Sequence, residues 1–182
     1  MTLWQQTGPG EKPAEVDPKI ARRAQIAGGA LSSPDRLILE SATGARSLSE
    51  DELRLVLSHV AQAGFDPIIY RGGSATEHHY QKHVLRQQEW PSETTLDDYL
   101  QSIQKVILDA RSGLFTSRYQ GAYQLGVIRP SSALRGPRGF DYVLVEYRLD
   151  LGRWVTAHQV ARGLAEIPSP QRTELRWLRQ PG

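Results

Sequence analysis

Apolar residues recur at a helical spacing in two stretches of the chain. From about 49 to 63 and from about 95 to 111 they form a continuous stripe with the period of an α-helix. A third helix is indicated after residue 74 and is stopped by Pro91. All three open with a hydroxyl residue followed three positions later by an acid, a helix-capping pattern. The pairs are Ser49 with Glu52, Ser74 with Glu77, and Thr95 with Asp98.

Later in the chain the apolar pattern changes to that of strands. The last two strands are joined by Asp150-Leu151-Gly152, a short hairpin connection whose glycine can adopt a positive φ. Successive strands joined by short turns favour an antiparallel sheet. We expect an α+β fold with N-terminal helices packed on one antiparallel sheet of four or five strands, formed mainly by residues 114–158. The expected strands are 114–119, 122–128, 142–149 and 153–158.

Glycine and proline mark both ends of the chain. Near the N-terminus they occur without apolar periodicity, which predicts a flexible lead. A short helix is expected after it, at about 17 to 27, with Asp17 as its N-cap. After Gln159 the pattern is lost and prolines return, which predicts irregular structure. The expected segments are a flexible lead (1–16), a helical N-terminal segment for delivery or a partner (17–65), a functional core (66–160) and an irregular C-terminal tail (161–182).

Length and composition exclude several classes of protein. The 182 residues suffice for one domain with a real core and are too few for two large ones. The absence of cysteine excludes disulfides and thiolate metal sites. No stretch approaches the roughly 20 apolar residues of a membrane span, and the N-terminus lacks a secretory signal. We expect a soluble protein without a membrane segment; delivery into a target cell cytoplasm by a non-Sec route stays open.

Positive charge is concentrated in one part of the chain. The formal net charge is only +2, but residues 111–153 contain seven arginines against three acids. This imbalance indicates a polyanion such as RNA as a partner of that part. The alternative is that these arginines occupy ordinary solvated positions on strands and loops.

Three of the five histidines lie within six residues, at 78, 79 and 83. On a helix, His79 and His83 share one face with Lys82 beside them. A metal site needs a third ligand, and neither an HExxH motif nor a cysteine supplies one, so we expect no metal. Acid–base catalysis is the other chemistry, because imidazole titrates near neutral pH and a neighbouring lysine favours its basic form. The alternative is one half-buried structural histidine and one facing solvent.

Other residues could complete a site for cleaving RNA without a metal. Thr156 and His158 lie at the end of the last expected strand. Phosphate could be held by Arg118, Arg129 or Lys82, and by the hydroxyl of Ser131 after Arg129-Pro130.

This set of motifs resembles a known class of nucleases. The stretch from His79 to His83, a helix with Tyr99-Leu100 and a strand-rich end at Trp154–His158 are similar to the C-terminal nuclease domains of bacterial polymorphic toxins. These are metal-independent ribonucleases of the barnase, EndoU, colicin and RelE type, or their RNase A-like relatives. The resemblance covers about residues 74–160 and implies sites at His79, Lys82, His83, Arg129, Thr156 and His158.

The resemblance also implies a mechanism and partners. One histidine of the 79/83 pair would take the 2′-hydroxyl proton, the other or His158 would protonate the 5′-oxygen, and Lys82 with Arg129 would stabilise the phosphorane. The expected product is a 2′,3′-cyclic phosphate. The expected partners are an RNA substrate and a cognate immunity protein, no cofactor is expected, and the oligomeric state stays open.

Two other functions are compatible with the sequence. Arg71, the run from Phe115 to Ser117 and Glu146 follow the order found in ADP-ribosyltransferases, which use NAD, although Leu144 stands where that class carries a first acid. A non-enzymatic RNA- or protein-binding module is the third possibility, since Trp154 and neighbouring tyrosines alternate with basic residues on the strands.

Overall fold

The structure is a computed structural model that describes residues 31–67, 69–70 and 73–182. Leu31 to Gly182 form one compact unit. The expected lead (1–16) and the expected helix at about 17 to 27 lie outside the described residues. In the described part of the chain, no helix is both long and apolar enough to cross a membrane.

Four α-helices occur in the described residues, and three start where the capping pattern predicts. Ser49, Ser74 and Thr95 each accept a hydrogen bond from the backbone N–H three residues on, and the acid at that position accepts one from the backbone N–H of the cap residue. The third helix continues into a π-helical turn, η1. The bounds are α2 (Ser33–Ala42), α3 (Glu50–Ala63), α4 (Ala75–Tyr80), η1 (Gln81–Arg86) and α5 (Leu96–Leu108).

The helices accompany a five-stranded sheet with the order β6-β5-β4-β3-β7, antiparallel throughout, which confirms the expected α+β fold. Gly152 in the β5–β6 hairpin has a φ of 59°, as its sequence position predicts. The strands are β3 (Gly113–Tyr119), β4 (Ala122–Pro130), β5 (Tyr142–Arg148), β6 (Arg153–Val160) and β7 (Arg172–Arg179). Smaller elements are β1 (Ile69–Tyr70), β2 (Gly73–Ser74), η2 (Ser132–Leu134) and η3 (Gly163–Glu166).

The expectation of an irregular tail over 161–182 is wrong for its second half. Strand β7 lies there and pairs with β3, the first strand of the sheet in sequence. Pro168 and Pro170 precede β7 and Pro181 follows it, so no proline interrupts its ladder. Trp177 anchors the strand, since its ring lies 5.4 Å from that of Phe115. This strand therefore depends on its pairing with β3 and on the contact of Trp177 with Phe115, and not on a periodic apolar pattern of its own.

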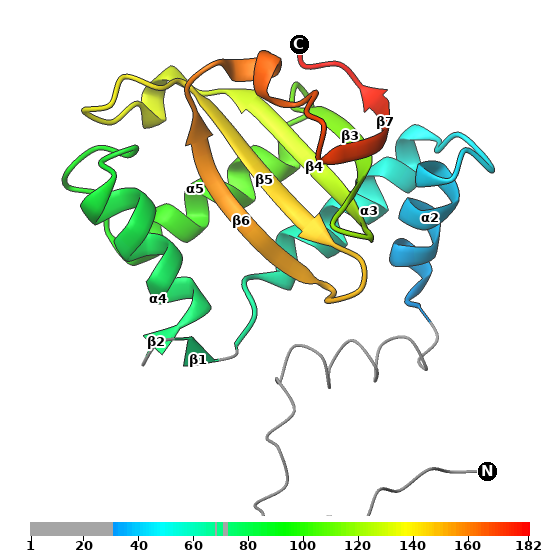
Figure 1. Cartoon of the computed structure of the whole chain (residues 1–182), viewed down its shortest axis with the longest axis horizontal. Helices are drawn as coiled ribbons and strands as arrows, with labels where there is room; N and C mark the ends of the chain where they lie inside the picture. Colours follow the sequence, from blue (N-terminus) through cyan, green and yellow to red (C-terminus); the bar gives the residue numbers. More distant parts are fainter. Residues whose placement is uncertain (1–30, 68, 71–72) are drawn as a thin grey trace, which may run out of the picture. The chain divides into compact units, whose positions relative to one another are not determined.

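The two faces of the sheet carry different residues. Helices α3 and α5 pass behind the sheet in Figure 1 and bury one face in the main core, around Val60, Ile103 and Val145. The other face holds a smaller apolar cluster, in which Ile167 of the η3 connection packs with Phe115. Beyond that cluster the side chains on the second face are polar, so this end of the face does not form part of an apolar core.

The outer edge of β6 is covered by groups from the helical layer. The N–H of Trp154 donates to the carbonyl oxygen of Gly64 (2.8 Å), and the hydroxyl of Tyr99 donates to the carbonyl of Ala157 (2.7 Å). The N–H of Gln159 donates to a carboxylate oxygen of Glu89 (2.8 Å). These bonds satisfy an edge that would otherwise pair with another strand, and they hold the segment after η1 against the residues that flank His158.

Candidate functional site

Three histidines, two neighbouring ones and one from a distant part of the chain, stack on one another. The rings of His79 on α4 and His83 on η1 are 5.7 Å apart and inclined by 9°. The ring of His158 on β6 lies 5.5 Å from that of His83 at 26°. Phe65 covers the far side of His79 at 4.4 Å. The expected pairing of the helical histidines with the last strand is therefore present as a column of rings.

His83 is the interior member of this column. It is 3% exposed, and its Nδ1 lies 3.2 Å from both carboxylate oxygens of Glu89, itself 5% exposed. Its Nε2 is buried without a hydrogen-bond partner among the described residues. In this structure the ring therefore lies in the interior beside His158. The role of His83 as acid or base stays a prediction, and its burial favours a supporting position for it.

Lys82 lies on the outside of the same turn and is exposed. The turn is π-helical, and the N–H of Gln87 bonds to the carbonyl of Lys82 five residues before it. Such turns occur frequently at functional sites. Lys82 adds a positive charge near the column, since it contributes to lowering the pKa of both His79 and His158.

Both flanking histidines are held in the neutral form. Burial is the main cause that lowers the pKa of His79 to about 3, followed by the charge of His83. Burial likewise lowers the pKa of His158 to about 4, again followed by His83, although Glu89 and Glu166 act in the opposite direction. At neutral pH each ring therefore keeps one unprotonated nitrogen, which can accept a hydrogen bond or, when an anion beside it raises its pKa, a proton.

His158 lines a pocket of about 530 Å³ on the sheet face opposite α3 and α5. We call it the sheet-face pocket. The side chains that matter for its chemistry are Gln124, Glu146, Arg148, Thr156, His158 and Arg172. Thr156 Oγ1 and His158 Nδ1 are hydrogen-bonded at 3.0 Å, which fixes the ring and leaves Nε2 for proton exchange with a ligand.

A carboxylate and several guanidinium groups lie in the same pocket. Glu146 pairs across the strands with Thr156 and forms a 2.6 Å ion pair with Arg172. Arg148 is buried and bonded to Asp150. Arg162 is exposed, with a long contact of 4.0 Å to Glu166. Sequence reasoning missed Glu146 and Arg148 for a nuclease site; the signal was two charged residues at alternate positions of an otherwise apolar strand.

The expected phosphate-binding residues lie elsewhere. Arg129 forms an ion pair with Asp109 (2.9 Å) and lines, with Ser131, a separate pocket along α5. Arg118 on β3 bonds to Glu174. None of the three lines the sheet-face pocket, so the expected grouping with the histidines is not formed. The arginines at 111, 118, 129, 135 and 148 all have carboxylate partners, which reduces the excess charge inferred from the sequence.

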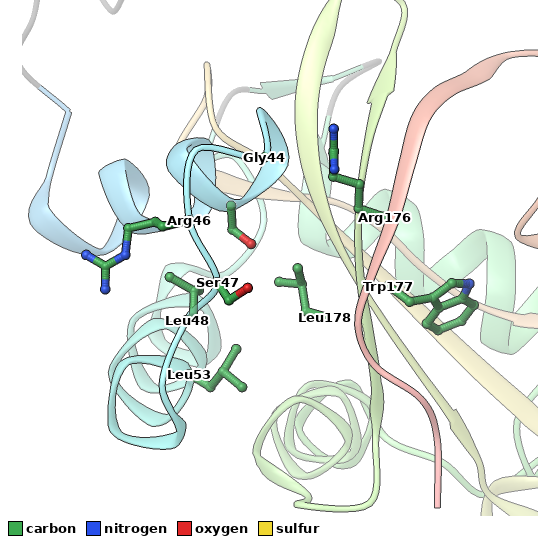
Figure 2. A pocket seen from close by; sticks show the side chains of 9 residues that line it. Gly44, Arg46, Ser47, Leu48, Leu53, Arg176, Trp177 and Leu178 are labelled. Carbon is green, nitrogen blue, oxygen red and sulfur yellow. The ribbon is translucent and has the colours of Figure 1, made fainter.

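A further pocket lies between the α2–α3 loop and β7. Figure 2 shows Leu48, Leu53 and Leu178 facing one another inside it, while the guanidinium groups of Arg46 and Arg176 are turned away from them. The pocket thus has an apolar side formed by the three leucines and a polar side, where the guanidinium group of Arg176 lies next to Gly44.

The remaining expectations concern metals and NAD. In the described residues, no group of three histidine or acidic side chains is placed to hold a metal ion. Arg71, the first element of the ADP-ribosyltransferase pattern, lies outside the described residues. Comparison with known proteins found no matching family model, no matching curated protein and no matching solved structure.

Proposed function

We propose that this protein is a metal-independent ribonuclease whose reacting groups lie in the sheet-face pocket. The observation that supports it is the position of His158, a neutral imidazole in one pocket with Glu146 and the arginines at 148, 162 and 172. RNA cleavage by its own 2′-hydroxyl needs a proton acceptor and cations around a phosphate, and these residue types supply both.

Each residue has a role in this scheme. His158 takes the 2′-hydroxyl proton at Nε2, the 2′-oxygen bonds to phosphorus, and the bond to the 5′-oxygen breaks. The leaving oxygen takes a proton from solvent, and the product is a 2′,3′-cyclic phosphate. Arg162 and Arg172 hold the phosphate and stabilise the added charge. Glu146 keeps Arg172 in place through their ion pair.

The histidines behind the pocket support His158. His83 stacks on its ring and, through Glu89, is connected to the backbone of Gln159. His79 extends the column, and Lys82 places a positive charge near an incoming polyanion. The role of an antagonistic toxin, delivered into another cell and neutralised by an immunity protein, is part of the proposal and rests on the sequence resemblance alone.

The experiment is RNA cleavage in EDTA by the purified chain, beside His158→Asn. A matched control is His59→Gln, since His59 lies on α3 and bonds to Tyr147 outside the pocket. We expect fragments with cyclic phosphate ends from the wild type and His59→Gln, and a loss of about 10²–10⁴-fold in His158→Asn. Intact RNA with all three proteins, or a requirement for a divalent ion with 5′-phosphate products, would overturn the proposal.

A further inference from the structure

Two buried polar side chains at the end of the sheet-face pocket near Gln124 have unused hydrogen-bonding atoms: one lines the pocket and the other lies beside it on the next strand. Gln124 on β4 lines the pocket and is 2% exposed, and its Oε1 has no partner among the described residues. Ser117 lies directly opposite on β3, is 0% exposed, and its Oγ likewise has no partner. The Cβ atoms of directly opposed residues lie about 4.5–5.5 Å apart, so one ligand could contact both side chains.

Such an arrangement is costly in the free protein. A buried polar atom without a partner destabilises the folded state, because it has lost its hydrogen bonds to water, and native structures contain few of them. Two neighbouring ones on one sheet face, of which Gln124 lines a pocket, indicate a place where a ligand supplies the missing hydrogen bonds. An ordered water would be the alternative occupant, and the binding experiment below distinguishes the two.

The pocket wall beside these residues is aromatic. Tyr119 lies two positions after Ser117 on the same strand and lines the pocket. Its hydroxyl donates to Oε1 of Gln171 at 3.1 Å, which ties the ring to the segment before β7. Aromatic side chains next to amide groups suit a flat ligand that carries hydrogen-bonding groups on its edge.

We propose that Gln124, Ser117 and Tyr119 form a nucleobase-binding subsite that decides which base lies next to the cleaved phosphate. The inference rests on the proposed ribonuclease function and specifies its substrate. Gln124 pairs with Arg148 on β5, whereas His158 pairs with Leu144, four positions away on the same strand, so the two backbone positions lie roughly 15 Å apart across the sheet. Both side chains line the same pocket, and a nucleotide bound along it would place its base toward Gln124 and its phosphate toward His158.

The side-chain amide explains how the subsite would discriminate. Gln124 presents one acceptor and one donor side by side, and the four bases differ in where they carry the complementary pair. A base that leaves Oε1 of Gln124 or the Ser117 hydroxyl without a hydrogen bond binds more weakly, because a buried polar atom then stays unsatisfied. A hydrogen-bonded pair of this kind is worth about 1–3 kcal/mol of discrimination, or roughly 10- to 100-fold in rate.

The first experiment measures cleavage of two dinucleotide series, NpA and ApN, with each of the four bases as N. The wild type is compared with Gln124→Met, which keeps the volume, and Ser117→Ala, a smaller change that serves if the first variant does not fold. Gln101→Met is the matched control, because Gln101 is exposed on α5 outside this pocket.

We expect the wild type and Gln101→Met to prefer one base by at least about tenfold in one series. In Gln124→Met or Ser117→Ala the preference should fall to less than about threefold. Equal rates for all bases in the wild type, or an unchanged preference in both folded variants, would overturn the subsite.

A second experiment keeps the subsite separate from catalysis. The four nucleoside 3′-monophosphates are titrated into the wild type and the variants by calorimetry, with circular dichroism as a check of folding. A base-dependent affinity that Gln124→Met removes would support the subsite even if no RNA is cleaved, in which case the ribonuclease proposal alone fails. Affinities independent of the base, or equally base-dependent in the variants, would mean that water hydrogen-bonds to Gln124 and Ser117, and the subsite would be rejected.

Discussion

The carboxylate of Glu89 lies 3.2 Å from Nδ1 of His83, and both side chains are buried. The same carboxylate accepts the backbone N–H of Gln159 at 2.8 Å. One acid thus satisfies a ring nitrogen of the π-helical turn and an outward-facing N–H of the edge strand. The position of His158 depends on it, since His158 stacks on His83 and precedes Gln159 in the strand.

Replacing Glu89 should therefore destabilise the fold. Glu89→Ala leaves two buried donors without an acceptor, and we expect a loss of about 3 kcal/mol in the free energy of unfolding. Glu89→Gln keeps one acceptor oxygen and should lose less. Urea denaturation measures both, beside Glu93→Ala, an exposed acid whose removal should change stability by less than about 0.5 kcal/mol. Equal midpoints for Glu89→Ala and the control would contradict this account of the edge.

Stability should fall in mild acid because of the histidine column. The pKa of His79 is lowered to about 3 and that of His158 to about 4, against ordinary values near 6.5. The unfolded chain therefore binds more protons than the folded one below pH 6.5. The stabilisation is fully present above that pH and is lost as the pH falls toward 4.

The variant His79→Phe tests this dependence. It keeps a ring against Phe65 and removes one titrating group. Urea denaturation at pH 7, 6 and 5 should show a shallower decline in the free energy of unfolding than in the wild type. A decline of the same steepness in both proteins would show that His79 is not responsible.

The ion pair between Glu146 and Arg172 gives an asymmetric prediction. Both side chains are largely buried, so Arg172→Met leaves a buried carboxylate without its cation, and we expect a loss of about 3–5 kcal/mol. The double variant Arg172→Met with Glu146→Gln removes both charges and should recover most of it. Thermal and urea unfolding of the single and double variants form the cycle. A double variant that is less stable than Arg172→Met would show that the pair is not the reason.

Gly126 is required by the ring of Phe115. The two residues pair across β3 and β4, and a Cβ at Gly126 would overlap the ring. We expect Gly126→Ala to destabilise the protein by about 1–3 kcal/mol. Phe115→Leu should relieve the overlap, so the double variant Phe115→Leu with Gly126→Ala should lose less than the two single changes added together. Strict additivity in urea denaturation would argue against this contact.

Local signals accounted for much of the fold. The N-termini of three helices, at Ser49, Ser74 and Thr95, and the four expected strands depend on residues that are close in sequence. Patterns between such near neighbours can be recognised without a structure. Strand β7 was not readable, because it is held by β3 and by the contact of Trp177 with Phe115 across more than 60 positions. The prolines of this segment predicted irregular structure, but all of them lie outside β7 and leave its hydrogen bonds intact.

The candidate site divides in the same way. The i, i+4 spacing showed that His79 and His83 are neighbours, and it could not show that His83 faces the interior toward Glu89. Arginine counts could not distinguish cations held by carboxylates, such as Arg129, from those that line the sheet-face pocket. Because side chains alternate along a strand, the sequence indicates that Glu146 and Arg148 share one face of the sheet. It does not indicate which face the helices cover, and so it could not show that Glu146, Arg148 and Thr156 line a pocket on the other one.

The late position of β7 affects how the protein is made. Glu146 receives its cation from Arg172, 26 positions further along, and Gln171 reaches Tyr119 from the same segment. A growing chain that still lacks this segment has neither the ion pair nor that wall of the pocket. The pocket is therefore incomplete in a growing chain to which β7 has not yet been added, and a ligand that depends on this wall can bind only after that strand has been made.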